Sequence, residues 1–338
     1  MNTLLTPLRR FLKIRGMGPA LTAFAGLVII YIVFGMLEPM VFSPTNIMNL
    51  LRSMSKYLLI GIGQSYVLIT GNIDLSIGSV VGMSAMISAT LMTKGAPILP
   101  AVLITMICCL TVGGINGVLV GKFRLPPFIA TLGTMFVARG VAYMVNGNRN
   151  TDAISSGISK ESAERLENFF YYGKTFEVFN TFWIAIILFA VFFFLLSKTR
   201  TGRHIYAIGS NLEAAKLSGV NVAATTTKAY LVSAFCSFVV GLILCAQSGM
   251  GNMEAGVMYE MYGVAAGVIG GVSPLGGTGI LLGTLAGSAV WQTLENGLSM
   301  QGAPVGIQRV VIGVIVVFAV LLDVVLRRGK LFRRPLGK

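Results

Sequence analysis

The chain has 338 residues, of which 55% are hydrophobic and only 11% charged, and its mean hydropathy is +0.81. Soluble domains carry about a quarter of charged residues, so these values exclude a soluble fold and predict an all-α polytopic membrane protein. The formal net charge of +14 does not indicate nucleic acid as a partner, because the basic residues lie beside apolar runs, where they set membrane topology.

Apolar runs follow one another along nearly the whole chain. The first, 19–37, is too long for the core of a signal peptide and lacks a small-residue cleavage site, so it is interpreted as a span. The runs predict about ten spans in all, with limits left open around 57–78 and 262–279. The further spans are expected at 57–71, 76–93, 98–121, 127–145, 179–197, 229–248, 262–272, 278–297 and 305–326.

Basic residues divide the chain between the two sides of the membrane. The tail 1–18, the loop 198–228 and the tail 327–338 are rich in Lys and Arg, which predicts that all three, and both termini, are cytoplasmic. No flexible linker splits the chain, so a single integral membrane domain is expected over 19–326.

The longest outer segment is 146–179, which is predicted to face the periplasm. Its polar stretch ISKESAERLENFF has the apolar spacing of a short amphipathic helix. Two roles stay open for this helix: receiving a protein that delivers the substrate, or resting as a spacer at the membrane interface. Arg52 and Lys56 fit the topology poorly, because they precede the second span from the same outer side.

The loop 198–228 is the basic hydrophilic loop inside the chain. Ser210 precedes Glu213 by three residues, as in a capping box, and Gly219 suits the left-handed conformation that ends a helix. This pattern predicts a helix of about two turns over 211–218. Because so short a helix is marginal in water, it either meets a soluble partner that moves the spans or belongs to a solvated loop.

Two glycine-containing stretches interrupt apolar regions, TGNIDLSIG at 70–78 and GGVSPLGGTG at 270–279. Such stretches are typical of an unwound segment that lines a polar cavity, or of a helix that ends at the membrane edge. Glycines at helical spacing elsewhere, as at Gly113, are expected to let helices approach closely. An Asn-Gly pair occurs at 116–117 and again at 296–297. This weak repetition is compatible with two structurally related halves of the chain.

Ionisable groups inside the spans are few, and each needs an explanation because a charge at the bilayer centre costs roughly 2.5 to 3.5 kcal/mol. Asp74, followed by Ser76, fits the N-cap and first turn of the third span. Glu295 faces either a transport pathway or a neighbouring helix, and the sequence leaves both open. The other charged positions in spans are Arg139, Arg309 and Asp323.

Motifs for catalysis are absent from the sequence. It contains no Walker A loop, H-E-x-x-H, G-x-S-x-G or C-x-x-C, and its one histidine, His204, lies in the cytoplasmic loop. The four cysteines fall in apolar runs without metal-ligand spacing. We therefore expect no catalytic, cofactor or metal site in this chain, and favour passage of a small polar solute.

Three motifs carry a family resemblance: TGNIDLSIG at 70–78, TGRHIYAIGSNLEAAKLSGVNV at 201–222 and VIGGVSPLGGTGILLGTLAG at 268–287. They resemble the permease subunits of bacterial sugar ABC importers of the ribose, xylose, arabinose and galactose group, and the resemblance extends from Met40 to Leu326. It implies an ABC importer permease fold with broken or short helices in the bacterial cytoplasmic (inner) membrane.

The same resemblance implies partners. A cytoplasmic ATP-binding subunit would bind ATP and Mg²⁺, a periplasmic sugar-binding protein would deliver a pentose or hexose, and a second permease copy or paralogue would complete a dimer within the membrane lipid. The residues that the resemblance and the loop pattern assign to coupling with the ATPase are Ser210, Asn211, Glu213, Ala214, Ala215 and Gly219.

A sugar pathway needs polar side chains of modest affinity, because a tightly held solute would not be released. The expected lining residues are Gln64, Asn72, Asp74, Asn116, Thr131, Gln292, Glu295 and Asn296. Two rival functions stay open: a proton-coupled secondary carrier for a small polar solute, and a channel-like subunit with passive flux. The sequence does not specify the sugar, the host organism, or whether the dimer partners are identical.

Overall fold

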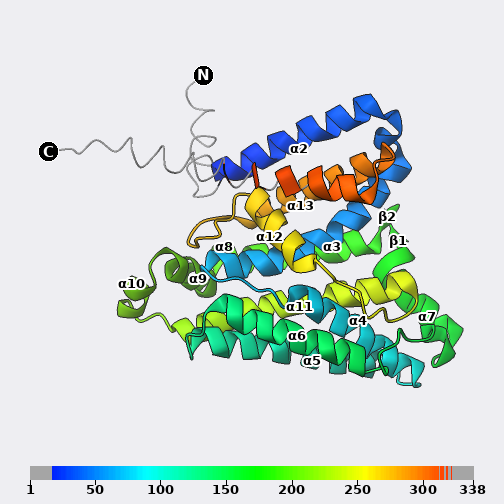
Figure 1. Cartoon of the computed structure of the whole chain (residues 1–338), viewed down its shortest axis with the longest axis horizontal. Coiled ribbons are helices and arrows are strands. Elements are labelled where there is room, and N and C mark those ends of the chain that lie inside the picture. The colour runs from blue at the N-terminus through cyan, green and yellow to red at the C-terminus, as the bar shows by residue number, and fades with distance from the viewer. Residues whose placement is uncertain (1–16, 312, 316, 319–320, 322–338) are drawn as a thin grey trace.

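The computed structural model describes residues 17–311, 313–315, 317–318 and 321, and its architecture is almost entirely helical (Figure 1). Most of the predicted N-terminal tail, the whole predicted C-terminal tail and Asp323 lie outside the described residues. The two termini of the described part therefore give no test of the predicted cytoplasmic tails.

The long helices form an elongated bundle, and short elements connect them at its ends (Figure 1). The α-helices are α2 (Met17–Leu37), α3 (Pro44–Ile69), α4 (Ile77–Thr93), α5 (Ile98–Gly121), α6 (Pro127–Met144), α7 (Lys160–Glu167), α8 (Asn180–Lys198), α9 (Arg200–Ser210), α10 (Leu212–Leu217), α11 (Val222–Ser248), α12 (Tyr259–Ile269) and α13 (Leu281–Met300). The short elements are the 3-10 helices η1 (Pro39–Phe42) and η2 (Ile154–Ser156), the π-helix η3 (Asn168–Tyr172), and the paired antiparallel strands β1 (Lys174–Thr175) and β2 (Val178–Phe179).

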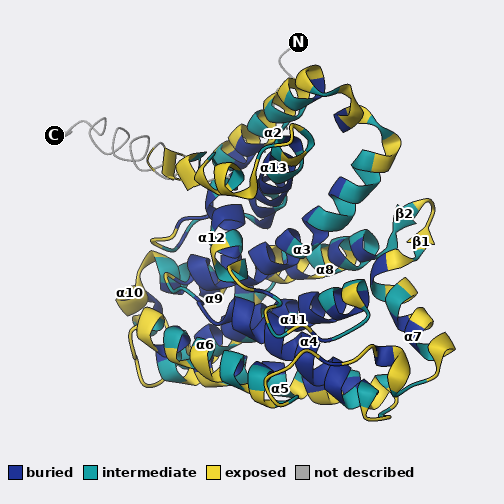
Figure 2. Ribbon diagram, turned by 45° about the vertical axis from the view of Figure 1, so that its right-hand side comes forward, coloured by how far each residue is buried: buried dark blue, intermediate teal, exposed yellow. Residues whose placement is uncertain are grey.

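Helix α11 lies at the centre of the bundle, where it packs against α3, α4 and α5. Figure 2 shows α11 and α4 as largely buried, whereas α2 and α5 expose much of their surface. Glycine makes the contact with α5 possible: a Cβ on Gly117 would collide with Thr227, and one on Gly113 would collide with the carbonyl of Tyr230. This close approach confirms the predicted role of small residues.

The predicted spans as far as α13 each coincide with a helix. Helix α3 begins at Pro44, well before its predicted limit, because the Ser43 hydroxyl caps it by accepting from the Asn46 amide at 3.2 Å. Helix α11 also begins before its predicted limit, under a cap from the Asn221 side chain. The last predicted span, 305–326, starts as a helix but lies partly outside the described residues.

Among the described residues, five helices are long and apolar enough to cross a bilayer: α2, α5, α6, α8 and α11. Helix α12 has 11 residues, which cover about 16 Å of the roughly 30 Å of hydrocarbon. It therefore needs a non-helical segment to complete its passage. The chain is an all-α polytopic membrane protein with short and broken helices, as the sequence predicts.

The segment 146–179, predicted to be periplasmic, forms one end of the molecule, opposite α9 and α10 (Figure 1). It contains the expected short helix, α7, which Ser159 caps by accepting from the Ser162 amide at 3.2 Å. Ala163 and Leu166 of α7 are buried, so the apolar face of this helix packs against the protein.

Arg52 and Lys56, which fitted the predicted topology poorly, both find partners at this outer end. The Arg52 guanidinium lies over the rings of Tyr171 and Phe179, at 4.5 and 4.0 Å from their centroids. The Lys56 ammonium donates to the Gln247 side chain at 3.2 Å. Arg52 thus holds α3 against the segment 146–179, and Lys56 holds it against the end of α11, which explains their position.

Candidate functional site

The basic loop 198–228, predicted to be cytoplasmic, folds as two helices, α9 and α10, where the sequence predicted one over 211–218. The predicted capping box is wrong, because Ser210 ends α9. Asn211 is the N-cap of α10, and its side-chain oxygen accepts from the Ala214 amide at 2.9 Å. An Asn side chain caps a helix as well as Ser does, so the residue next along the chain takes the role.

The end of α10 follows the sequence closely. Gly219 has a φ of +78°, and its amide donates to the Lys216 carbonyl at 2.9 Å, while the Val220 amide donates to the Ala215 carbonyl at 3.0 Å. This pair of bonds is the Schellman ending that the glycine predicted. Glu213 pairs with Lys216 instead of closing a capping box. The hydrogen bond from Lys216 holds the pKa of Glu213 below its ordinary value of 4.5.

Helix α10 presents apolar side chains to the surroundings. Leu217 is 91% exposed and Leu212 is 40% exposed, whereas Ala215 is buried against the rest of the loop. Leu212 and Leu217 lie about 140° apart around the helix axis, so they are two separate exposed apolar side chains on a helix of six residues. Leu217, the more exposed of the two, is accessible to another protein.

Helix α9 docks onto both glycine-rich interruptions. A Cβ on Gly209 would collide with the Ile69 carbonyl, and that same carbonyl accepts from the Gly277 amide at 2.8 Å. The Tyr206 hydroxyl donates to the Gly279 carbonyl at 2.7 Å. Burial raises the pKa of Tyr206 to about 12. The ends of the two interruptions are thus tied to each other and to α9.

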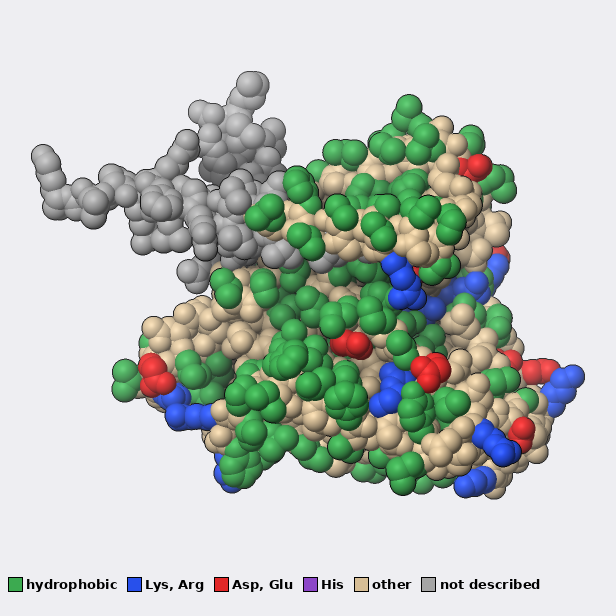
Figure 3. Space-filling view, in the orientation of Figure 1, with side chains coloured by type: hydrophobic (Ala, Val, Ile, Leu, Met, Phe, Trp, Pro, Cys, Tyr) green, Lys and Arg blue, Asp and Glu red, His purple; other side chains and the backbone are tan. Residues whose placement is uncertain are grey.

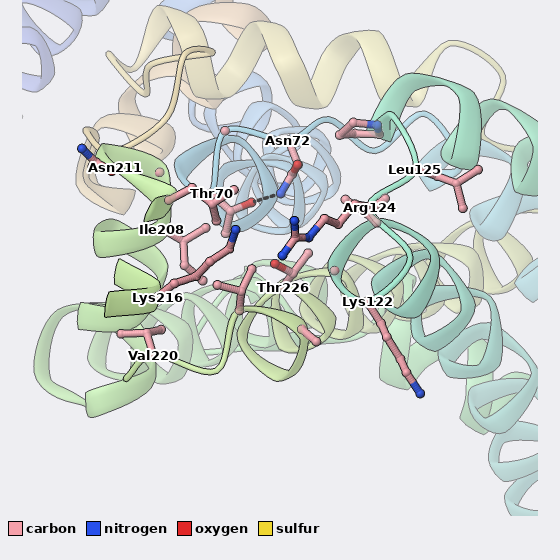
Figure 4. A pocket seen from close by; sticks show the side chains of 18 of the residues that line it. Thr70, Asn72, Lys122, Arg124, Leu125, Ile208, Asn211, Lys216, Val220 and Thr226 are labelled. Atoms are coloured by element: carbon pink, nitrogen blue, oxygen red, sulfur yellow. Dashed lines mark hydrogen bonds between the residues drawn. The ribbon is translucent and has the colours of Figure 1, made fainter. Parts of the chain in front are cut away.

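A pocket of about 700 Å³ lies between α9, α10, the first interruption and the α5–α6 turn (Figure 4). The side chains of Arg124 and Lys216 reach toward its middle, near Asn72 and Thr226, whereas Lys122 points away. No acidic residue of the described part lines the pocket. Asn72, nominated for the transport pathway, therefore lies at a basic cavity on the end of the bundle that carries α10.

The first interruption, 70–76, encloses a buried carboxylate. Asp74 is 2% exposed and accepts from the Ser76 amide and hydroxyl at 2.9 and 2.6 Å, and from the Ser233 hydroxyl at 2.7 Å. The Asn116 amide donates to the Ser76 hydroxyl at 2.9 Å, which joins two nominated residues in one network. The predicted N-cap role of Asp74 is wrong, since Ser76 precedes the first helical residue and Asp74 stabilises the turn before it.

A second non-helical segment, 249–258, connects α11 to α12 and was not predicted. It runs beside α4: a Cβ on Gly251 would meet Ala89, and a Cβ on Gly256 would collide with the Gly78 carbonyl near the start of that helix. The start of α4 lies at the depth of the Asp74 network, which reaches the middle of α11 through Ser233. The segment therefore descends into the interior of the bundle.

One guanidinium group holds this second segment in place. Arg139 of α6 donates from Nη1 to the carbonyls of Met253 and Ala255, at 2.8 and 3.0 Å, and from Nη2 to the carbonyl of Gly78 at 3.2 Å. Arginine suits this task because its donors form a rigid planar fork. Arg139 joins the second segment to the start of α4, which directly follows the first interruption.

The chain matches the model of one protein family over residues 46–320, and that family is described as the branched-chain amino acid transport system/permease component. The chain belongs to this family. The permease is a component of a transport system and not itself an enzyme.

Individual relatives cover the permease almost from end to end. It is 34% identical to the ribose import permease protein RbsC of Haemophilus influenzae over 309 residues, which is 91% of this chain and 94% of the relative. It is 32% identical to the D-allose transport system permease protein AlsC of Escherichia coli, with 88% and 89% covered. Identity to the galactose/methyl galactoside import permease protein MglC of Salmonella typhimurium is 33%, with 85% and 88% covered. No solved structure matches the permease.

Three other nominated residues of the permease lie apart from these networks. Gln64 is fully buried, and neither amide atom has a hydrogen-bond partner in the described part of the chain. Gln292 is also buried, with its carbonyl oxygen unpaired there. The Thr131 hydroxyl donates to the Pro127 carbonyl of its own helix at 2.8 Å. These three side chains are buried, but their contacts do not bring them together in one site.

The two nominated residues near the end of α13 have partners on α3. Glu295 accepts from the Tyr57 hydroxyl at 2.8 Å. The side-chain amides of Asn296 and Asn46 pair reciprocally, at 3.1 and 3.0 Å. Both contacts attach α13 to α3, which accounts for these polar groups through helix packing.

The sequence did not predict the role of two features of the permease. Arg139 was recognised as a charge inside a span, but its carbonyl partners lie far along the chain, at Met253 and Ala255. The exposed Leu217 looked like an ordinary helix residue. The closely spaced glycines at 249, 251 and 256, with Glu254 between them, were the available signal for a broken helix.

Proposed function

We propose that the permease imports a sugar of the pentose or hexose class across the bacterial cytoplasmic membrane by alternating access. A separate cytoplasmic subunit binds ATP with Mg²⁺ and drives the cycle. The observation that carries the proposal is similarity along nearly the whole chain to ribose, allose and galactose permeases. The family description names branched-chain amino acids, so an amino acid is the competing substrate class.

The ATPase contact in this proposal is α10. Asn211 and Gly219 fix the two ends of this helix, and the exposed Leu217 and Leu212 offer it an apolar surface. Of the other residues assigned to coupling, Ser210 joins α9 to α10, Glu213 and Ala214 are exposed, and Ala215 seats the helix.

Motion passes from α10 to the membrane through α9. A push on α10 moves α9, whose Gly209 and Tyr206 contact both interruptions at Ile69 and Gly279. Because the interruptions precede α4 and α13, a shift at this point tilts both helices together. By this route, closure of the ATPase subunit changes the side of the membrane to which the sugar pathway opens.

Other partners occupy the opposite end and the sides of the bundle. In the proposed orientation, the segment 146–179 faces the periplasm and receives a sugar-binding protein. A second permease copy or a close paralogue completes the pathway within the lipid bilayer. The distribution of Lys and Arg supports this orientation, because the loop 198–228 is the most basic loop between spans.

Reconstitution tests the proposal. The permease is placed in liposomes with its ATPase subunit and its binding protein, and uptake of radiolabelled D-ribose, D-allose, D-galactose and L-leucine is measured. We expect ATP-dependent uptake of at least one sugar and none of leucine. Leucine uptake without sugar uptake would overturn the substrate class. Sugar uptake driven by a pH gradient without the ATPase would establish the proton-coupled carrier instead.

A substitution tests the contact at α10. Leu217→Asp is expected to weaken ATPase binding about tenfold or more, as loss of a central apolar contact does. Phe176→Asp is the matched control, because Phe176 is 87% exposed at the opposite end of the molecule. Equal ATPase binding by the two variants would remove α10 from the interface.

A further inference from the structure

Polar groups gather on one face of the permease where the second non-helical segment meets α4. Asn252, Glu254, Val257 and Met258 of this segment are exposed, although the segment descends along α4 toward the middle of the bundle. Figure 3 shows acidic and basic side chains close together within the largely hydrophobic face that carries α6 and α12. Exposed irregular backbone and charge thus occur at membrane depth on one face.

Such a face cannot contact lipid. Hydrocarbon offers no hydrogen bonds to irregular backbone, so non-helical segments at this depth occur only where protein or a water-filled cavity adjoins them. Charged side chains within spans likewise face protein or water. The segment 249–258 and the adjacent start of α12 therefore adjoin water or protein and not lipid, and their charged groups favour a polar space there.

The groups available for binding in this polar space are hydrogen-bond acceptors. Glu260 lies at the start of α12 with a carboxylate oxygen beside Gly78, and it makes no ion pair within the described residues. Glu254 accepts from the Tyr143 hydroxyl at 2.8 Å, which leaves its second oxygen available. Both Nη1 hydrogens of Arg139 are used by backbone carbonyls. The Arg139 guanidinium therefore stabilises the segment 249–258, and the carboxylates of Glu260 and Glu254 remain available to bind a ligand.

We propose that this crossing point of α4, α6 and the segment 249–258 is a binding site for the hydroxyl groups of a neutral sugar. Glu260 and Glu254 accept hydrogen bonds from sugar hydroxyls, and Arg139 is the positioning residue that keeps the irregular backbone in shape. The inference rests on the proposed import of a sugar and assigns its contact inside the membrane.

The same geometry disfavours a free amino acid. An α-carboxylate needs a pair of donors, such as the fork of an arginine, and Arg139 already directs three donors to carbonyl oxygens. Two glutamates beside it would also repel an anionic group. A sugar hydroxyl presents a donor hydrogen, which suits a carboxylate acceptor.

The test uses the permease reconstituted with its ATPase and binding protein, and D-ribose as the probe. Glu260→Gln is expected to reduce the rate of ribose uptake severalfold, because the neutral amide oxygen accepts a weaker hydrogen bond than the carboxylate does, while ATPase binding stays intact. Glu38→Gln is the control, because Glu38 caps the distant η1 helix through an oxygen that Gln retains. Equal uptake by the two variants would overturn the site.

A second measurement is independent of the solute. The Val257→Cys variant is treated in liposomes with a water-soluble, membrane-impermeant maleimide and compared with the Ile107→Cys variant, whose position on α5 is 61% exposed. We expect the thiol introduced by Val257→Cys to react, and the thiol introduced by Ile107→Cys to stay unlabelled in lipid. Absence of labelling in the Val257→Cys variant would overturn the polar space. Labelling of that variant without uptake of any sugar would reject the proposed substrate while keeping the polar space.

Discussion

Two non-helical segments of the permease, 70–76 and 249–258, are stabilised by ionisable side chains of opposite type. The first has a buried acid, Asp74, which accepts hydrogen bonds from one backbone amide and two hydroxyls. The second is held by Arg139, which donates hydrogen bonds to the carbonyls of Met253 and Ala255 and to that of Gly78 in α4. An acceptor thus stabilises the first segment and a donor the second.

The difference follows from which backbone groups each segment presents. Asp74 lies just before the first turn of α4, where helix amides are unpaired, and it accepts from the Ser76 amide. Arg139 instead meets carbonyls of the irregular segment after α11, at Met253 and Ala255, and the Gly78 carbonyl in the first turn of α4, all of which need a donor. The first segment is sealed by hydroxyl groups, but the second stays exposed on one face.

Removing the donor should have the largest effect. Arg139→Met leaves three carbonyl groups without their donor, and each of them that water does not reach costs about 1–3 kcal/mol. We expect a clear fall in the melting temperature of the purified permease in detergent. Arg149→Met, on an exposed outer residue, serves as the control. Equal melting temperatures would show that the second segment holds its shape unaided.

Removing the acceptor should have a smaller but distinct effect. Asp74→Ala deprives Ser233 and Ser76 of their acceptor, at a cost of about 1–3 kcal/mol for each group that stays unpaired. The same melting experiment is expected to show a fall relative to Asp152→Ala, which alters an exposed acid. A variant as stable as this control would mean that water replaces the carboxylate, and the seal around the first segment would be disproved.

The link between the first interruption and α9 is tested by adding a single methyl group. Gly209→Ala places a Cβ against the Ile69 carbonyl and should separate α9 from both interruptions. We expect ATP hydrolysis to continue while sugar uptake per ATP falls severalfold. Gly114→Ala is the matched control, because a Cβ there has no neighbour within 4 Å. Unchanged stoichiometry in Gly209→Ala would exclude this contact from coupling.

The ending of α10 should give a modest effect. Gly219→Ala meets no neighbouring atom, but alanine at a φ of +78° costs about 1 kcal/mol through backbone strain. An isolated peptide spanning α10 would not reproduce the helix ending. The measurement is therefore hydrogen exchange of the α10 amides in the whole permease. Faster exchange is expected in the variant, and identical exchange would show that the Schellman ending does not limit opening.

Acidification should produce the smallest change, confined to α10. Because the pKa of Glu213 is lowered in the folded state, its pairing with Lys216 is present above pH 4.5 and is lost as the pH falls through the lowered value. Exchange of the α10 amides should therefore rise in that acidic window, and Glu213→Gln should abolish the rise. A rise of the same size in the variant would assign the effect to another group.

Prediction from the sequence succeeded where neighbours along the chain decide the structure. Apolar runs located the spans, and Gly219 located the end of α10, because both depend on local hydrophobicity or backbone conformation. Prediction failed where distant partners decide it. The sequence around Arg139 does not indicate that its partners are the carbonyls of Met253 and Ala255. The position of α9 likewise depends on its contacts with the two interruptions, which are distant in the sequence.

The same distinction applies to the nominated pathway residues. Asp74 and Asn116 do belong to one network, since Asp74 lies within the break that the glycines signalled and Asn116 of α5 donates to Ser76 at its end. Glu295 and Asn296 look equally polar in the sequence, yet each is paired with α3. Side-chain chemistry alone could not separate a group that faces a cavity from one that joins two helices.

The basic pocket beside α9 has a consequence for negatively charged solutes. Arg124 and Lys216 reach toward its middle, and no acidic residue of the described part lines it. Gly209 and Ser210 form part of its wall, so an anion held by the two cations would link the α5–α6 turn to the junction of α9 and α10. Such a link would make the movement of α10 sensitive to the ions around it.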